Sequence, residues 1–335
     1  MTAELERLKS EHGWHADSVA TFDGSLGLWV AREFQPGDSV YSDSQWTEMD
    51  SLIDDSWWYK TRNRVILKVL RRHTYSNLIW DVGCGSGVVG GFLNNHGYSV
   101  IGLEPSTAGA VLTVKRGLTA FCGTLGSLAL PSESLQNVSM FDVLEHLEDR
   151  QAALKECRRV LRPGGLLVLS LPALKLLWSQ LDVDGGHFLR YNKRSIRREL
   201  SKNGFEVVQS GYFFALTVLP LLVLRVIPFR LGMRRAAATE ATLAADGGAD
   251  REICRMDRVT NRDSSAVRKQ PLRRRPKKVV GVVQNSRVVR PRRGSAATTT
   301  VRAFARGSRE SGARLRGPRY EPPRPSAWSA RWVRS

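Results

Sequence analysis

The chain of 335 residues is long enough to form one large domain or two smaller ones around a buried core. Its formal net charge of +19 is placed very unevenly. Residues 1–231 carry 25 Lys and Arg against 24 Asp and Glu, whereas residues 232–335 carry 26 against 8. The charge is therefore a property of a C-terminal tail, and the near-neutral body does not have the composition of a nucleic-acid-binding domain.

The four cysteines form no recognisable metal or disulfide pattern. Cys84, Cys122, Cys157 and Cys254 are scattered, with no C-x-x-C pair and no metal-ligand spacing to histidines. We therefore expect neither a zinc site nor a disulfide framework, and no bound metal. The N-terminal run MTAELERLKSEHGW lacks the apolar core of a signal peptide, so the sequence predicts a cytoplasmic protein.

Residues 1–76 are predicted to form a helical cap on the domain that follows. Within Asp55–Leu70, apolar residues recur at the spacing of an amphipathic helix, at Trp58, Val65, Ile66, Val69 and Leu70. Trp58 could instead cover an aromatic or lipid-like substrate, although aromatic residues on a helix more often belong to the core.

Strands and helices alternate from residue 78 onward. Apolar runs predict strands at Leu78–Val82, Ser99–Leu103, Thr119–Cys122, Val138–Phe141, Leu166–Leu171 and Phe205–Val208. Helical patterns lie at Val88–His96, Pro105–Arg116, Glu148–Leu161 and Lys193–Lys202. Because parallel strands need such crossover helices, we expect an α/β fold with a mostly parallel, doubly wound, Rossmann-like sheet over residues 77–231.

Residues 232–335 form the third predicted region. They are rich in Arg, Ala, Ser, Gly and Pro and contain few periodic apolar runs, so we expect a basic, disordered tail. The abrupt shift in composition would also fit translation out of an ancestral reading frame. Val279–Val283 is a candidate for a further strand, but it lies about seventy residues after the last predicted one, so we do not expect it to complete the sheet.

The run DVGCGSG, residues 81–87, joins the first of these strands to a helix. Glycine lets the backbone turn tightly there and lets a ligand approach more closely than a Cβ atom would allow. Glu104 ends the next strand, and adjacent parallel strands bring the two tips together, so its carboxylate can accept both hydroxyl hydrogens of a ribose. A dinucleotide fingerprint started at Gly83 needs a small residue at position 88, where this chain has Val88, and NAD is therefore disfavoured.

The D-x-G-x-G-x-G pattern resembles the cofactor loop of class I S-adenosylmethionine-dependent methyltransferases. Three further segments follow in the order seen in the methyltransferase type 11 and quinone-biosynthesis group: FDVLEHLED from Phe141, RRVLRPGG from Arg158 and LVLSLPA from Leu167. The resemblance covers roughly Trp46 to Gly232. It implies a methyltransferase activity with S-adenosylmethionine as the cofactor.

The resemblance also implies which residues bind that cofactor. Asp81 would help to orient the charged amino-acid end, and Thr124 and Leu125 would lie along the adenine. An acid common in relatives at position 124 is absent, so this contact would be made through the backbone. The implied cofactor-binding residues are Asp81, Gly83, Cys84, Gly85, Gly87, Glu104, Thr124, Leu125, Phe141 and Asp142.

Methyl transfer from a sulfonium ion needs an aligned acceptor and, for a hydroxyl acceptor, a base that removes its proton. The segment GGHFLRY, residues 185–191, resembles the family's G-H-x-R-R-Y pattern, with Leu189 in place of the first arginine. His187 could deprotonate an acceptor or could tie its loop to the sheet through hydrogen bonds. The candidate catalytic residues are His187 and Tyr191, and the candidate substrate contacts are Trp58, His146 and Arg190.

Tyr212–Leu224 is an apolar run without a charged residue. Its 13 residues fall short of the ~20 that a helix needs to span a bilayer. It is predicted either to pack beside the substrate site or to lie in a membrane interface and bring the enzyme to a lipid-soluble substrate. Peripheral membrane contact thus stays open, whereas a transmembrane span is not expected.

The sequence predicts methylation of oxygen or carbon on a small-molecule or lipid-like acceptor. One alternative is an RNA or protein methyltransferase that uses the basic tail for affinity, although the asparagine-proline-proline-tyrosine type of motif is absent. Another is a non-enzymatic nucleic-acid-binding protein on a Rossmann scaffold. Salt-dependent RNA binding that is lost without the tail would favour either alternative.

Overall fold

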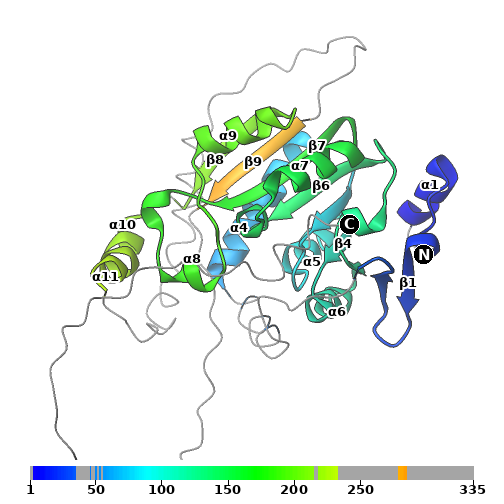
Figure 1. Cartoon of the computed structure of the whole chain (residues 1–335), viewed down its shortest axis with the longest axis horizontal. Helices are drawn as coiled ribbons and strands as arrows, with labels where there is room; N and C mark the ends of the chain where they lie inside the picture. The colour runs from blue at the N-terminus through cyan, green and yellow to red at the C-terminus, as the bar shows by residue number, and fades with distance from the viewer. Residues whose placement is uncertain are drawn as a thin grey trace, which may run out of the picture.

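A computed structural model of the chain describes residues 3–34, 46, 50, 53, 56–214, 218–232 and 278–284. These residues form one nine-stranded sheet with helices packed on it (Figure 1). The strand order is β1-β2-β5-β4-β3-β6-β7-β9-β8, and all neighbouring strands are parallel except β1 and β2. The mostly parallel α/β sheet predicted from the sequence is thereby confirmed.

The elements follow the predicted alternation closely. The strands are β1 (Ala20–Asp23), β2 (Leu28–Ala31), β3 (Leu78–Val82), β4 (Ser99–Glu104), β5 (Thr119–Cys122), β6 (Leu135–Phe141), β7 (Leu161–Pro172), β8 (Glu206–Phe213) and β9 (Lys278–Gln284). The helices are α1 (Ala3–His12), α2 (Ala16–Val19), α4 (Trp57–His73), α5 (Val88–Asn94), α6 (Thr107–Lys115), α7 (Arg150–Val160), α8 (Gln180–Asp184), α9 (Lys193–Lys202), α10 (Val218–Leu221) and α11 (Ile227–Arg230). Shorter turns are η1 (Gly126–Leu128), η2 (Leu144–His146), η3 (Lys175–Leu177) and the π-helical η5 (Leu222–Val226). The bounds of β3, β5 and α9 are those that the sequence predicts.

The N-terminal region contributes strands as well as helices. β1 pairs antiparallel with β2, and β2 pairs in parallel with β5. The predicted helical cap therefore also extends one edge of the sheet. The amphipathic helix predicted in this region is α4, and its buried residues include Trp58, Ile66, Val69 and Leu70.

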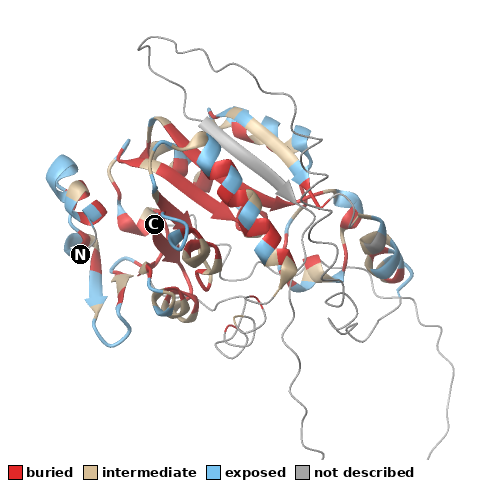
Figure 2. Ribbon diagram, turned by 180° about the vertical axis from the view of Figure 1, so that it is seen from behind, coloured by how far each residue is buried: buried red, intermediate tan, exposed pale blue. Residues whose placement is uncertain are grey.

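Two apolar cores lie against the sheet, as expected for a strand layer covered on both faces. Residues of α4 and α5 pack in one core, with Ile79 of β3. Residues of α7 and α9 pack in the other, with Trp80 of β3. Successive residues of β3 thus point to opposite faces. The buried residues run through the central strands (Figure 2).

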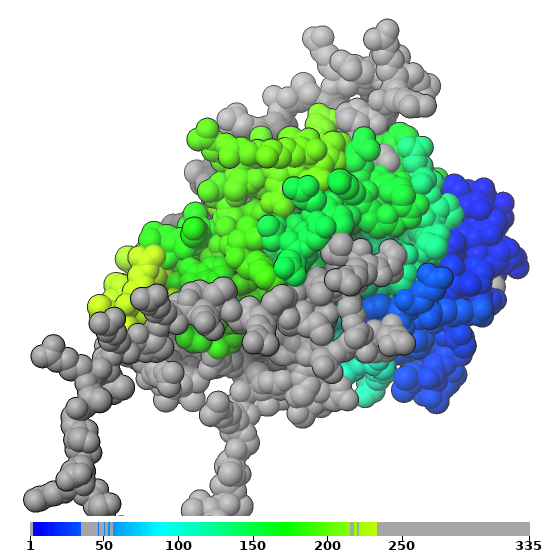
Figure 3. All heavy atoms as spheres, in the orientation of Figure 1, coloured from blue at the N-terminus to red at the C-terminus, as the bar shows by residue number. Residues whose placement is uncertain are grey.

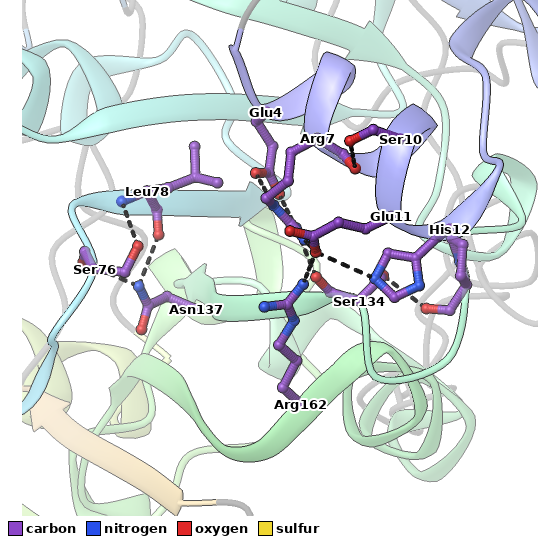
Figure 4. A network of polar contacts seen from close by, with 11 residues as sticks. Glu4, Arg7, Ser10, Glu11, His12, Ser76, Leu78, Ser134, Asn137 and Arg162 are labelled. Atoms are coloured by element: carbon purple, nitrogen blue, oxygen red, sulfur yellow. Dashed lines mark hydrogen bonds and ion pairs between the residues drawn. The ribbon is translucent and has the colours of Figure 1, made fainter.

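Helix α1 is fixed across the amino-terminal ends of β6 and β7 by charged side chains (Figure 4). Arg7 donates to the Glu4 carboxylate at 2.7 Å and to the backbone oxygen of Ser134 at 2.8 Å. Arg162, in β7, donates to Glu11 at 2.6 Å. Hydrogen bonds from Arg162 and Arg7 lower the pKa of Glu11. This network lies at the opposite end of the strands from the glycine loop.

The segment expected to lie outside the sheet forms a strand. Lys278–Gln284 is β9, and it pairs in parallel with Leu166–Pro172 of β7 and with Glu206–Phe213 of β8. The expectation that it does not complete the sheet is therefore wrong. Closing the long loop between β8 and β9 costs chain entropy. β9 nevertheless lies between β7 and β8 and pairs with both. The other residues of the predicted tail beyond Gly232 lie outside the described residues.

Truncation tests the role of β9. A chain that ends at Gly232 lacks this strand, so β8 loses its hydrogen-bonded neighbour and β7 gains an open edge. We expect its melting temperature, followed by circular dichroism, to fall by more than about 5 °C. A chain that ends at Gln284 should melt with the full-length protein, and equal melting of the two truncated chains would contradict the role assigned to β9.

Candidate functional site

The glycine loop follows β3 and adopts a backbone that glycine favours. Gly83, Gly85 and Gly87 have φ angles of 72°, 59° and 74°, in the left-handed region. A Cβ atom on Gly83 would lie 2.6 Å from Val143, and one on Gly87 would lie 2.9 Å from the hydroxyl of Thr113. The Gly83 amide donates to the backbone oxygen of Leu103 at 2.7 Å, which holds the loop against β4. The predicted juxtaposition of loop and strand tip is present.

Glu104, at the end of β4, organises the loop. Its carboxylate accepts hydrogen bonds from the Gly85 amide at 2.9 Å and from the Ser106 amide at 3.0 Å. Each carboxylate oxygen can accept a second hydrogen bond, so the group still has capacity for two ribose hydroxyls. The side chain is 3% exposed, and burial raises the pKa of Glu104 to about 7, while the two amides oppose that rise.

Asp81 lies beside Glu104 at the end of β3. It is 2% exposed and accepts a hydrogen bond from the Ser139 hydroxyl of β6 at 2.7 Å. Burial raises the pKa of Asp81 to about 7, the Ser139 hydrogen bond and the charge of Arg62 lower it, and the charge of Glu104 raises it further. The two carboxyl groups are therefore held in an environment that favours a bound cation or a proton.

Arg62 of α4 reaches the same edge of the sheet. Its guanidinium donates to the Asp142 carboxylate at 2.6 Å, and Asp142 also accepts from the Ser170 hydroxyl at 3.2 Å. Asp142 has a φ angle of 57°, a strained conformation for a residue other than glycine. The sequence did not predict a role for the buried Arg62, whose ion pair with Asp142 joins α4 to the predicted cofactor site.

The remaining predicted cofactor contacts are buried around this site. The Thr124 amide donates to the Ser127 hydroxyl at 2.9 Å, so it is engaged within its own turn. Leu125 is 2% exposed and Phe141 is 7% exposed. Cys84 is partly buried, and burial raises the pKa of its thiol well above the usual value. The backbone contact predicted at Thr124 stays a prediction.

A second polar cluster lies in the segment after β7. Asp182 of α8 accepts from Nδ1 of His187 at 2.9 Å and from Nε and Nη2 of Arg190 at 2.6 and 3.0 Å. Burial raises the pKa of Asp182, but these two partners outweigh that effect and hold it below the usual value. Arg190 also donates to the Ala173 backbone oxygen at 3.0 Å. An ionised Asp182 therefore orients the imidazole of His187, in the arrangement that general bases use.

Glu145 and His146 of η2 lie against this cluster. The Glu145 backbone oxygen accepts from the Phe188 amide at 2.8 Å, and the rings of His146 and His187 meet edge to face at 4.7 Å. Burial, followed by the neighbouring His187 charge, lowers the pKa of His146 to about 3. Burial and the charge of Asp142 raise the pKa of Glu145 well above its usual value, and its carboxyl oxygens have no hydrogen-bond partner among the described residues.

Glu145, His146 and His187 also have the spacing of metal ligands. One ligand atom from each lies within 4.8 Å of the others. Carboxylates and neutral imidazoles are ligands for transition metals, and a metal-bound histidine commonly donates its other nitrogen to a carboxylate, as His187 does to Asp182. His146 and His187 are candidate site residues from the sequence, but their grouping with Glu145 depends on two loops that are distant along the chain.

Two further predicted site residues, Tyr191 and Trp58, are almost fully buried. Tyr191 is 1% exposed within an apolar core, and burial raises the pKa of its phenol. Trp58 is 3% exposed and stacks on Phe214 at 4.0 Å. Both environments fit a structural role. The catalytic role of Tyr191 and the substrate contact of Trp58 stay predictions.

The site lies largely within a segment that matches a known domain. Residues 80–169 match the family model described as a methyltransferase domain, Methyltransf_11. Residues 80–169 thus form a segment similar to the methyltransferase domain of S-adenosylmethionine-dependent methyltransferases. The matched residues include the glycine loop, Glu104 and His146, whereas His187 and Arg190 lie beyond them. The resemblance stated from the sequence is confirmed.

Two curated methyltransferases are similar to part of this chain. A probable S-adenosylmethionine-dependent methyltransferase of Mycolicibacterium smegmatis is 29% identical over 161 residues, which are 47% of this chain and 62% of the relative. A ubiquinone biosynthesis O-methyltransferase of Bradyrhizobium sp. (strain ORS 278) is 35% identical over 96 residues, which are 27% of this chain and 38% of the relative. The chain therefore spans less than two thirds of the length of these two relatives.

Among solved structures, this chain is similar to a phosphoethanolamine N-methyltransferase 2 of Haemonchus contortus in complex with S-adenosyl-L-methionine. The TM-score is 0.43 at 16% sequence identity, and the match covers 67% of this chain and 55% of that chain.

The raised pKa of Asp81 predicts a pH-dependent cost to stability. Between its usual value of 3.8 and about 7, the folded protein holds a proton that the unfolded chain has lost. The free energy of unfolding therefore falls as the pH rises through this window, and the full cost is present above pH 7. Asp81→Asn removes the ionisable group, and we expect the variant to be more stable than the wild type at pH 8, by on the order of a few kcal/mol, and nearly equal to it at pH 4.

Thermal melts without cofactor at the two pH values measure this difference. Asp17→Asn, at an exposed position, controls for the loss of one negative charge. A wild type as stable as the Asp81→Asn variant at pH 8 would show that the buried carboxyl carries no such cost.

Proposed function

We propose that this protein transfers the methyl group of S-adenosylmethionine to an oxygen or carbon atom of a small or lipid-like acceptor. The observation that carries the proposal is the buried Glu104 carboxylate at the tip of β4, fixed by the Gly85 and Ser106 amides. An acid in this position suits the vicinal hydroxyls of a ribose. Asp81 and Asp142, on the neighbouring strand ends, supply negative charge for the cofactor's ammonium and sulfonium groups.

The residues present fit this cofactor. Gly83, Gly85 and Gly87 present no side chain of their own to a ligand, and Arg62 offers a cation for the carboxylate at the amino-acid end. S-adenosylmethionine supplies an electrophilic methyl group. The protein must bind it, orient the acceptor in line with the carbon–sulfur bond and remove the acceptor's proton.

We propose His187 as the group that accepts this proton. Asp182 holds Nδ1 of the imidazole, which leaves Nε2 to face an acceptor hydroxyl. Burial raises the pKa of Glu145 well above its usual value, and in its protonated form this side chain would donate a hydrogen bond to an acceptor oxygen. Arg190 acts through Asp182, because its guanidinium keeps that carboxylate ionised and in place.

Calorimetry with Glu104→Ala tests the cofactor site. The variant loses the acceptor for the ribose hydroxyls, so we expect binding of S-adenosylmethionine to weaken by about 1.5 to 3 kcal/mol, or roughly 10- to 200-fold. Glu199→Ala, at a partly buried glutamate outside the site, is the matched control. No binding by the wild type, or binding of NADH in its place, would sink the proposed function.

Turnover measurements with His187→Gln and Asp182→Asn test the proposed base. Incubation with methyl-labelled cofactor and fractionated cell extract first identifies the labelled acceptor. We then expect His187→Gln to lower turnover by about 100-fold or more, with cofactor affinity nearly unchanged. Asp182→Asn should lower turnover by a smaller factor and shift its pH profile, because the imidazole loses its anionic partner.

His96→Gln, at an exposed histidine whose ring lies tilted against Phe92, is the control for these variants. Normal turnover by a folded His187→Gln protein would assign His187 to loop structure alone.

A further inference from the structure

The C-terminal helical segment has an unusual distribution of apolar side chains. α10, η5 and α11 run continuously over Val218–Arg230, about 20 Å of helix. Val226 and Pro228 are buried against the body. Five other positions expose leucine, valine or isoleucine, at Leu219, Val223, Leu224, Ile227 and Leu231. We call these five residues and the neighbouring, exposed Leu176 the apolar ridge.

The ridge is a continuous stripe and not a set of scattered residues. Leu219, Val223 and Ile227 follow one another at intervals of four along the helix, which places them on one face. Leu219 and Leu231 are 69% and 68% exposed. The Arg230 guanidinium donates to the Leu176 backbone oxygen at 3.4 Å, which joins η3 to the end of the helix. Contiguous exposed apolar surface of this kind marks an interaction site.

The ridge stands at one extremity of the molecule. In Figure 1, α10 and α11 lie at the end opposite α1 and β1, and in Figure 3 the same residues form the edge of the described surface. A flat partner such as a bilayer can approach an extremity without contacting the rest of the body. No helix among the described residues is long and apolar enough to cross a membrane.

The basic residues near the apolar ridge favour an anionic lipid surface over a second copy of this chain as its partner. Arg225 and Arg230 border the ridge, and Arg234 and Arg235 follow it in the sequence. Residues 232–335 carry 26 basic against 8 acidic side chains. A second copy of this chain would bring two such cationic regions together, whereas an anionic lipid surface would attract them.

We propose that the apolar ridge inserts into the interface of an anionic lipid membrane. The leucine, valine and isoleucine side chains enter the boundary between head groups and acyl chains, while the flanking arginines contact lipid phosphates. The proposal is independent of the methyl-transfer reaction, because it depends only on exposed residues outside the candidate site.

Vesicle co-sedimentation of the full chain tests the proposal. We expect the protein to bind vesicles of phosphatidylglycerol mixed with phosphatidylcholine much more tightly than vesicles of phosphatidylcholine alone. The triple variant Leu219→Ser, Val223→Ser, Ile227→Ser should bind the anionic vesicles at least about tenfold more weakly. Because these side chains are exposed, the variant should melt close to the wild type.

A matched triple variant separates insertion from attraction by the basic tail. Phe22→Ser, Leu26→Ser, Tyr75→Ser removes three exposed apolar side chains far from the ridge and should bind vesicles as the wild type does. Unchanged vesicle binding by the ridge variant would overturn the proposal and assign binding to the tail. Absence of vesicle binding by the wild type would overturn it as well. So would a dimer, seen in sedimentation without lipid, that the ridge substitutions convert to monomer.

Discussion

The burial of carboxyl groups at one edge of the sheet is the constraint on which the rest of the site depends. Asp81, Glu104, Glu145 and Asp182 are each at most 3% exposed; the first two lie at the carboxyl ends of β3 and β4, and the other two lie in the segments after β6 and β7. Ionised carboxylates are costly to bury without partners. The structure must therefore supply donors, allow protonation, or leave the cost to be relieved by a ligand.

Each of these solutions is used at a different carboxyl group. Asp182 has donors from His187 and Arg190, which hold its pKa below the usual value, whereas Glu145 has none among the described residues and burial raises its pKa well above the usual value. Asp81 and Glu104 lie between these limits, because their partners offset only part of the desolvation cost. The proposed cofactor carries two positive groups, so its binding would relieve the cost at the cofactor end. We therefore expect Asp81 and Glu104, whose partners offset only part of the cost of burial, to act in ligand binding. Asp182, which has partners for its charge, would position His187.

Local sequence patterns predicted those parts of the fold and site that depend on neighbours along the chain. The glycine loop and Glu104 were found because a strand-loop-helix unit and the next strand tip lie within 24 residues of each other. The partners Arg62 and Asp182 were missed because their roles arise only when α4 and α8 pack against the carboxyl ends of the strands. The place of β9 in the sheet was not predicted for a related reason. Its seven residues show apolar character, but their pairing with β7 depends on a contact across more than a hundred residues.

A hydrogen bond joins the apolar ridge to the segment after β7, which also carries His187. Leu176 and Arg190 belong to the segment after β7: Arg230 binds the backbone of the first, and Arg190 fixes Asp182 and the backbone of Ala173. If the ridge lies in a membrane interface, the segment that carries His187 is held next to that interface. A lipid-soluble acceptor could then reach His187 with little exposure to water, because the half-exposed Phe188 adds an apolar contact beside it. A lipid-soluble acceptor would thus give the position of the ridge a catalytic purpose, although the ridge proposal itself stands without the methyl-transfer reaction.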